Sequence, residues 1–399
     1  MDFSLSPELT ALRDQTRALM DTHVIPAEAA VLAEEADPEA TSPGETMLGL
    51  RDLARQAGLW TPHLPPEHGG RGLGVMGMSV LFREMGRSLI GPSAFGCDAP
   101  DQGNMDLLIK AASPMIQSRY LAPLCAGDIT SAFCMTEPAP GAGADPRNLR
   151  TTATQDGDAW RIDGHKWYST GGGRAAFLIV MARTSDDPRE GATLFIVDRH
   201  APGITHVRDI DVLAAPMLTH REAEFTFDNV RVTDDHIVGG VGQGFALAQK
   251  RLVPARLTHC MRWLGLADRA LNLCRGYLAE RVSFGQPLNR HQAIQRMVAD
   301  NATAIHSGNL MTFHCAWLLS RGEMTQARTF SSMAKTHVAN ALCKTLDDAI
   351  QMHGSLGYSH DMPFARWYTY ARAGRIADGP DEVHQWVVAR DFLMEKVDL

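Results

Sequence analysis

Apolar positions near the start of the chain repeat with the period of a helix. Leu9, Leu12 and Leu19 fall on one helical face. The segment from Ser113-Pro114 to Gly127 begins with a capping residue and proline and stops at a glycine, which is typical of a complete helix. The pattern therefore predicts an N-terminal helical domain over residues 1–130.

The period changes to that of β-strands in the middle of the chain. Residues 149–154 and 159–162 flank Asp156-Gly157, a strong signal for a tight hairpin. Further segments rich in β-branched and aromatic residues are predicted as strands: 176–182, 193–197 and 222–232. We expect a compact, β-barrel-like domain over residues 131–235.

Helical periodicity returns after residue 236 and is sustained over long segments. Val338, Leu342, Leu346 and Ile350 repeat every fourth residue until Gly354. Long helices with short connections predict a C-terminal four-helix bundle over residues 236–399. The predicted fold is α+β, with helices, then strands, then a bundle, and it lacks the strand–helix alternation of a Rossmann fold.

Composition narrows the classes of function. The 399 residues are 45% hydrophobic and 21% charged with a net charge of −8, typical of a globular protein and unlike a nucleic-acid-binding protein. No apolar run of about 18 residues predicts a membrane span. The N-terminal residues lack the pattern of a signal peptide, and the seven cysteines form no Cys-x-x-Cys pair, so we expect a cytoplasmic protein with reduced thiols and no metal site.

The most informative candidate residue is Asp378, in the segment Arg375 to His384. It stands directly before Gly379-Pro380, where a new helix is predicted to begin. Asp is a preferred helix cap, so the simplest interpretation is an N-cap. The alternative is a base that is held at a helix start and directed into a cleft.

Four other segments carry candidate chemistry: 133–145, 163–173, 281–292 and 351–358. The first two place small residues, aromatics and hydroxyls where a flat ring or a pyrophosphate could approach the backbone. Arg281 could clamp a phosphate, since a guanidinium matches oxyanions bidentately. Each segment also has an ordinary explanation: a glycine-rich turn, a hairpin with core aromatics, a surface arginine, and a helix C-cap.

Taken in this order on this helix–sheet–helix plan, the segments resemble the acyl-CoA dehydrogenase family of flavoproteins over essentially the whole chain. The matching motifs are Thr136-Glu137-Pro138 to Asp145, Asp163 to Thr170, and Arg281-x-x-Phe284-Gly285 followed by Gln292. The resemblance implies an FAD between the β domain and the bundle. The residues that it implies for FAD binding are Phe133, Met135, Thr136, Gly143, Ala144, Tyr168, Thr170, Arg281, Phe284, Leu288, His291, Gln292, Gln351, Gly354 and Ser355.

The resemblance also implies an assembly and an electron acceptor. Arg281 and Gln292 would reach the FAD of a neighbouring subunit, so we expect a homo-oligomer, a dimer or a homotetramer. The expected acceptor is an electron-transfer flavoprotein, and the expected setting is fatty acid and other lipid metabolism.

Several positions depart from the family pattern. Ala144 replaces the usual Ser, Tyr168 replaces the usual Trp, and Asp378 replaces the usual Glu. The other base position of the family falls on Ala255, so Asp378 is the only base that the motifs match. The string Asp378 to His384 is similar to a subgroup linked to long, branched or 4-hydroxylated acyl chains.

The function implied by the resemblance is desaturation of an acyl-CoA thioester. Asp378 would remove the α proton while the β hydrogen leaves as hydride to flavin N5. The backbone N–H of Asp378, the backbone N–H of Gly379 or a flavin hydroxyl would polarise the thioester carbonyl. Arg256 and Gly379 would bind substrate, and a water-poor pocket would raise the pKa of Asp378, tempered by Arg256.

Other functions on the same plan stay open. Nitroalkane oxidases resemble this family and use an Asp base, and flavin monooxygenases share the architecture. A non-catalytic flavin-binding paralogue is a further alternative.

Overall fold

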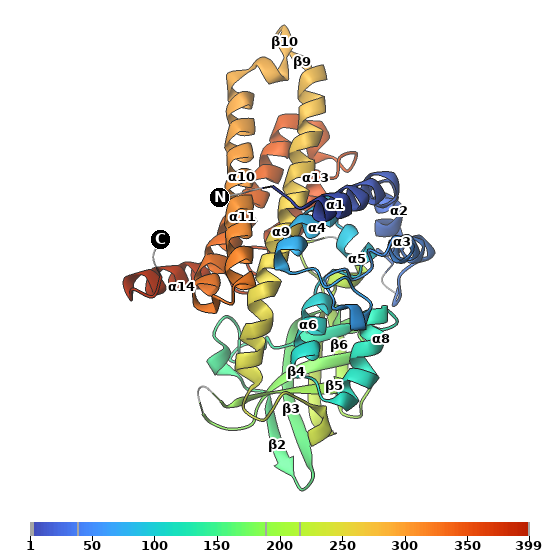
Figure 1. The fold of residues 1–399 in the computed structure, drawn as a ribbon, viewed down its shortest axis with the longest axis vertical. Coiled ribbons are helices and arrows are strands. Elements are labelled where there is room, and N and C mark those ends of the chain that lie inside the picture. The colour runs from blue at the N-terminus through green and yellow to red at the C-terminus, as the bar shows by residue number, and fades with distance from the viewer. Residues whose placement is uncertain (1–3, 38–39, 188–189, 215–216, 398–399) are drawn as a thin grey trace.

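The structure, a computed structural model, describes residues 4–37, 40–187, 190–214 and 217–397 (Figure 1). Part of the N-terminal segment on which the cytoplasmic prediction rests therefore lies outside the described residues. Helices dominate the first part of the chain: α1 (Pro7–Leu19), α2 (Ile25–Glu34), α3 (Glu45–Gln56), α4 (Val75–Met85), α5 (Gly91–Ala94), α6 (Asp101–Ala111), α7 (Pro114–Ile116) and α8 (Ala122–Ala126). Ser113 caps α7, and Gly127 ends α8 with a φ of 82°, as predicted.

A mixed sheet occupies the middle of the chain. Its strands are β1 (Ser131–Cys134), β2 (Thr152–Asp156), β3 (Ala159–Thr170), β4 (Phe177–Arg183), β5 (Ala192–Asp198), β6 (Ile204–Ile210), β7 (Glu222–Thr233) and β8 (Ile237–Val238). The order is β6-β7-β3-β2-β4-β5-β8, with β1 parallel to β4. The predicted β2–β3 hairpin is confirmed, with Asp156 opposite Ala159.

The barrel-like shape predicted for this domain is wrong. Among the described residues the strands at the two ends of the main order, β6 and β8, do not pair with each other, and β1 pairs with β4 alone. Alternating apolar positions reveal strands but carry no information on whether the first and last strands meet. The sheet is instead covered by helices, with α6 and α8 on one side in Figure 1.

The C-terminal part is a helical bundle with a small hairpin at its far end (Figure 1). Its elements are α9 (Gly244–Glu280), β9 (Val282–Ser283), β10 (Gln286–Pro287), α10 (Gln292–Ser320), α11 (Met324–His353), α12 (Ser355–Tyr358), α13 (Phe364–Ala373) and α14 (Asp381–Leu393). Three long helices pack together, and the shorter helices α13 and α14 pack on α11. Where four long helices were predicted, the described residues form three long helices and three shorter ones, α12, α13 and α14.

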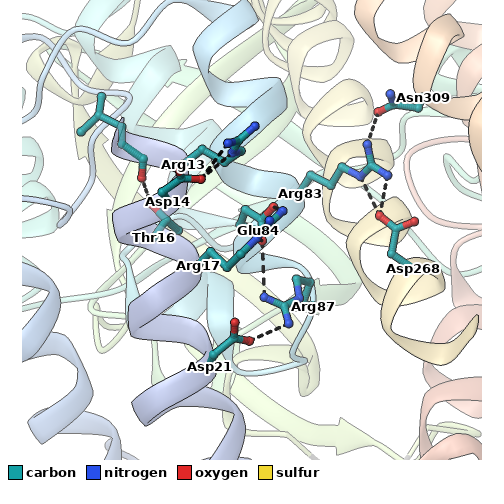
Figure 2. A network of polar contacts seen from close by, with 11 residues as sticks. Arg13, Asp14, Thr16, Arg17, Asp21, Arg83, Glu84, Arg87, Asp268 and Asn309 are labelled. Atoms are coloured by element: carbon teal, nitrogen blue, oxygen red, sulfur yellow. Dashed lines mark hydrogen bonds and ion pairs between the residues drawn. The ribbon is translucent and has the colours of Figure 1, made fainter. Parts of the chain in front are cut away.

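Helix α4 joins the N-terminal helices to the bundle through a polar network (Figure 2). Glu84 accepts a hydrogen bond from Arg17 of α1 at 2.6 Å. On the other side of α4, Arg83 contacts Asp268 of α9 at 2.5 Å and donates to Asn309 of α10 at 2.9 Å. One hydrophobic core runs through both helical parts, and two smaller cores line the sheet.

The lower half of α9 lies against the sheet, and its upper half belongs to the bundle (Figure 1). This helix therefore places its side chains at the junction of the three parts. None of the helices within the described ranges combines the length and the apolar character needed to span a bilayer.

Candidate active site

Asp378 lies in the turn between α13 and α14 with a left-handed backbone, φ 54°. Asp tolerates this conformation better than most residues. Gly379 follows with φ 108°, and a Cβ there would stand 2.9 Å from Nε2 of His384. The N-cap of α14 is Pro380, so the interpretation of Asp378 as a helix cap is wrong.

The backbone of this turn is held by three buried or half-buried basic side chains. Arg256 donates through Nε to the carbonyl oxygen of Asp378 at 2.8 Å, and His384 Nε2 lies 3.2 Å from the same oxygen. Lys335 donates to the carbonyl oxygen of Gly379 at 2.6 Å. These bonds fix the turn, while the N–H groups of Asp378 and Gly379 donate to no acceptor within the described residues.

The carboxylate of Asp378 faces a histidine on α9. Its Oδ2 lies 3.4 Å from Nε2 of His259, and both side chains are about one-fifth exposed, 22% and 19%. Arg262 donates to Nδ1 of His259 at 3.2 Å, and Trp263 stacks on the imidazole with 5.2 Å between ring centroids. Because a guanidinium can only donate, Nδ1 is the acceptor and Nε2 carries the hydrogen. His259 is therefore a neutral donor to Asp378.

The charges around Asp378 set its ionisation. Burial alone raises the pKa of this carboxyl, but the hydrogen bond from His259 and the positive charges of Arg251 and Arg256 outweigh burial and hold the pKa well below its usual range. The expectation of a raised pKa is therefore wrong. Burial and Arg262 lower the pKa of His259, which keeps the ring neutral near pH 7.

Sequence reasoning missed His259 and Arg251. Both lie on α9 with Arg256, which had been identified. His259 follows Arg256 by three positions, so the two side chains share one helix face. That spacing was the available signal, but a lone histidine in a helix is more often a packing residue. The contact with Asp378 depends on how α9 and the α13–α14 turn are packed.

Arg251 contacts the sheet and acts on Asp378 through its charge. Its guanidinium carbon lies 4.3 Å from the ring centroid of Phe133 in β1, and its Nε donates to Asn104 of α6 at 2.8 Å. Arg251 thus packs on Phe133, predicted as a flavin contact, and acts through its charge on Asp378.

The predicted cofactor residues of the sheet lie at the end of β1, in the loop that follows it and at the end of β3, and we call this surface the flavin ledge. Trp167 of β3 donates its backbone N–H to the carbonyl oxygen of Thr136 at 3.1 Å, which joins the end of β1 to β3. Tyr168 is 46% exposed with φ 49°. A Cβ at Gly143 would meet no atom within 4 Å. An exposed aromatic face beside a hydroxyl and an unobstructed glycine loop fits a planar ring with a polar tail, so these residues fit FAD.

The loop after β1 is organised by a buried ion pair. Lys166 donates to Glu137 at 2.8 Å, and their side chains are 0% and 2% exposed. Glu137 also accepts backbone N–H groups from Ala142, Arg150 and Thr151. Burial raises the pKa of Glu137, but Lys166 and these hydrogen bonds reverse the shift and lower it to about 2. The second residue of the Thr-Glu-Pro motif therefore shapes the loop.

The remaining predicted cofactor residues of the sheet lie nearby. Met135 follows β1 and accepts a hydrogen bond from Lys166 through its carbonyl oxygen at 3.0 Å. Thr170 ends β3, and its hydroxyl donates to Glu222 at 3.0 Å. Burial raises the pKa of Glu222, and the hydrogen bond from Thr170 opposes that shift. Ala144 is exposed in the glycine loop.

The other predicted cofactor residues gather at the opposite end of the bundle, around the β9–β10 hairpin and the start of α12. They are Arg281, Phe284, Leu288, His291, Gln292, Gln351, Gly354 and Ser355. Phe284 is 97% exposed. Arg281 follows Arg256 by 25 positions, which at a rise of about 1.5 Å per residue is roughly 38 Å along α9. The structure therefore does not bring this set to the ledge of the same chain.

Three family models match the chain in succession. They are the acyl-CoA dehydrogenase N-terminal domain over residues 6–128, the middle domain over 132–230 and the C-terminal domain over 242–393. A curated relative, the probable acyl-CoA dehydrogenase FadE2 of Mycobacterium tuberculosis, is 37% identical over 98% of this chain and 96% of its own length. Acyl-CoA dehydrogenase family member 11 of Mus musculus is 34% identical, and the chain spans half of its length.

Solved structures share the fold. One described as an acyl-CoA dehydrogenase of Mycobacterium abscessus is 37% identical with a TM-score of 0.92, covering 99% of this chain and 100% of that one. The FAD complex of PigA covers 99% and 100% with a TM-score of 0.89 at 19% identity, a likeness of fold alone.

Proposed function

This chain belongs to the acyl-CoA dehydrogenase family, and from that membership and the geometry around Asp378 we propose that it desaturates an acyl-CoA thioester between its α and β carbons. The observation that carries the proposal is the ionised carboxylate of Asp378, held in a rigid turn and facing the junction of sheet and bundle. The family match places the chain among oxidoreductases and leaves the acyl group unspecified.

Asp378 is the proposed base. Its low pKa means that it is fully ionised at neutral pH and free to accept the α proton at Oδ1 or Oδ2. The carboxylate itself is a weak base, so the α carbon must be made more acidic by its surroundings. The unpaired N–H groups of Asp378 and Gly379 are suited to this task, since two donors aimed at the thioester oxygen stabilise the developing negative charge.

The residues around the turn keep the base in position. The carbonyl oxygen of Asp378 is bound by Arg256 and His384, and that of Gly379 by Lys335. The backbone N–H groups of the two residues take no part in these bonds. His259 orients the carboxylate through Nε2–H but cannot relay the proton, because Arg262 occupies Nδ1. We assign His259 as a positioning residue.

FAD is the proposed cofactor, and when bound on the flavin ledge it supplies the acceptor for the β hydrogen and its electron pair. Met135, Thr136, Gly143, Tyr168 and Thr170 would hold it. Phe133 and Ala144 lie beside them and complete the proposed set on this side.

A second copy of the chain would supply the rest of the cofactor site. The hairpin residues lie too far from the ledge to reach the same flavin, and they are exposed. Arg281 and Gln292 would therefore bind the FAD of a neighbouring subunit, which makes the active form a homo-oligomer. An electron-transfer flavoprotein is the proposed acceptor of the electrons.

Anaerobic titration of the FAD-loaded protein with a panel of acyl-CoAs tests this function. Bleaching of the flavin absorbance with formation of the enoyl thioester is the expected result. Asp378→Asn should keep FAD and lose bleaching, because an amide cannot accept the proton. Wild-type reduction rates in this variant would refute the assignment. Oxygen consumption with a nitroalkane would instead indicate an oxidase, and failure to bind FAD a non-catalytic paralogue.

A further inference from the structure

A cavity lies where the sheet meets the N-terminal segment, and Asp378 is not among its lining residues. It has a volume of about 160 Å³ and is lined by residues of the β3–β4 connection, of β6 and of the segments around 40 and 220. Three of its lining side chains are arginines: Arg174, Arg199 and Arg221. Its remaining lining residues with ionisable side chains are His206 and Asp209.

Arg174 has no partner for its guanidinium. Its Nε is wholly buried, and its side chain donates no hydrogen bond to any acceptor within the described residues. The carboxylates of Asp101, Glu35 and Asp98 act on its charge, and no ion pair joins Arg174 to any of them within the described residues. Burial lowers the pKa of Arg174, because a cation kept away from water is disfavoured.

Arg199, which also lines the cavity, has an unpartnered guanidinium nitrogen as well. Its Nε is also buried without a partner, and only its Nη1 has a contact, at 3.0 Å from Nε2 of His200. Burial lowers the pKa of Arg199. Two arginines of one cavity thus lack acceptors, and each comes from a different loop.

The other charged groups of the cavity are already engaged. Asp209 lies 2.9 Å from Nε2 of His206. Arg221 donates to the backbone oxygens of Glu35 and Ala40, at 3.0 and 3.1 Å, and so ties the N-terminal segment to the wall. Nearby carboxylates act on the charges of Arg174 and Arg199 from a distance, but among the described residues neither guanidinium donates a hydrogen bond to a carboxylate, and these donors remain for a group that enters from outside.

We propose that this cavity is a binding site for a small oxyanion, a phosphate or a carboxylate, held by the guanidinium groups of Arg174 and Arg199. An arginine fork matches two oxygens of either group, and a buried cation gains most from such a partner. The volume admits a small anion or the charged end of a larger molecule. The cavity adjoins the proposed flavin ledge, since its lining residue Gly171 directly follows Thr170. The anion proposal does not depend on the dehydrogenase proposal.

Calorimetric titration of the FAD-loaded wild-type protein tests the site. The probes are inorganic phosphate and acetate, each against chloride at matched ionic strength. Saturable binding of at least one of them, with one anion per chain, is the expected result. Which of the two binds identifies the headgroup, and absence of saturable binding for both overturns the proposal.

Two variants locate the binding. Arg174→Gln and Arg199→Gln should each weaken the anion by about tenfold or more, since each removes a charged hydrogen-bond donor. Arg147→Gln is the matched control, because Arg147 lies in an exposed loop with its side chain 75% exposed, outside the cavity. FAD content, measured by absorbance, should be equal in all three. Unchanged affinity in both cavity variants would overturn the proposal, and Arg199→Gln keeps the test valid if Arg174→Gln does not fold.

Discussion

Replacing His259 tests how the short base of this protein is held. His259→Leu removes the Nε2–H that faces Oδ2 of Asp378 at 3.4 Å. His259→Gln can place an amide N–H near the same point and serves as the matched variant. A hydrogen bond to a charged acceptor contributes roughly 1.5–3 kcal/mol, and the long contact here favours the lower end. Because this donor stabilises the ionised carboxylate more than the partly neutralised one of the transition state, its loss does not by itself slow proton transfer. The slower reduction that we expect, by about tenfold, comes from lost positioning of the carboxylate, since a misplacement on the order of 1 Å can cost about a hundredfold.

The two replacements also differ in their pH dependence. The His259 hydrogen bond lowers the pKa of Asp378, so its removal raises that pKa towards the usual range. A carboxylate base becomes protonated and inactive when the pH falls through its pKa. In a plot of kcat/KM against pH, the fall in activity on the acidic side (the acid limb) should therefore move to higher pH in His259→Leu. Because Arg251 and Arg256 are unchanged, part of the depression should remain. His259→Gln should keep the limb near its wild-type position.

Stopped-flow reduction of the flavin by acyl-CoA, measured across pH, gives both quantities. The predicted outcome is a slower reduction with an upward shift of the limb for Leu and partial rescue for Gln. A purely structural role would lower FAD content or thermal stability in both variants without moving the limb. An unshifted limb in His259→Leu, with normal folding, would refute the reasoning. If the wild type is not reduced by any acyl-CoA, the dehydrogenase proposal fails first.

Other outcomes follow from the same structure. Arg281→Ala should weaken FAD retention by about tenfold, since a charged hydrogen bond is lost, and should shift the oligomer towards monomer in ultracentrifugation; unchanged flavin occupancy would count against the clamp between subunits. Glu137→Gln should lower the free energy of unfolding by about 3 kcal/mol in urea titrations, because it leaves buried Lys166 unpaired, whereas Asp145→Asn in the same loop should have little effect. The pKa of Glu137 lies at about 2, against a usual value of 4.5. Its ionised form therefore stabilises the fold fully above about pH 4.5, and this stabilisation is lost as the pH falls towards 2. Acid unfolding should accordingly show a stability difference between the wild type and Glu137→Gln that shrinks as the pH falls through this range.

Local signals predicted most of the fold. The β2–β3 hairpin was predicted from Asp156-Gly157, and the ends of α8 and α11 from Gly127 and Gly354. The strand β6 was not predicted, because its residues are mostly exposed and lack the apolar alternation of its neighbours. Sheet closure was predicted wrongly, since it depends on contacts between the first and last strands and on no local pattern.

The candidate site was predictable in its residues and not in its electrostatics. Motifs identified Asp378 and Arg256. The downward shift of the Asp378 pKa also depends on Arg251 and His259, which lie on a helix more than a hundred positions earlier in the sequence. Burial was the only influence that composition could indicate, and burial raises a carboxyl pKa. The three-dimensional packing adds the donors and cations that reverse it.

The turn itself explains why an aspartate can occupy this position. A residue with φ 54° pays a backbone cost that Asp, with its short polar side chain, tolerates better than longer residues. The same conformation aims the carboxylate at α9, where His259 stands at 3.4 Å, so a side chain longer by one carbon–carbon bond of about 1.5 Å would collide with the imidazole or turn away from it. Trp263 and Arg262 prevent the imidazole from moving aside. The short base, the left-handed turn and the fixed histidine therefore depend on one another, and a change in any one of them alters the position of the proton acceptor.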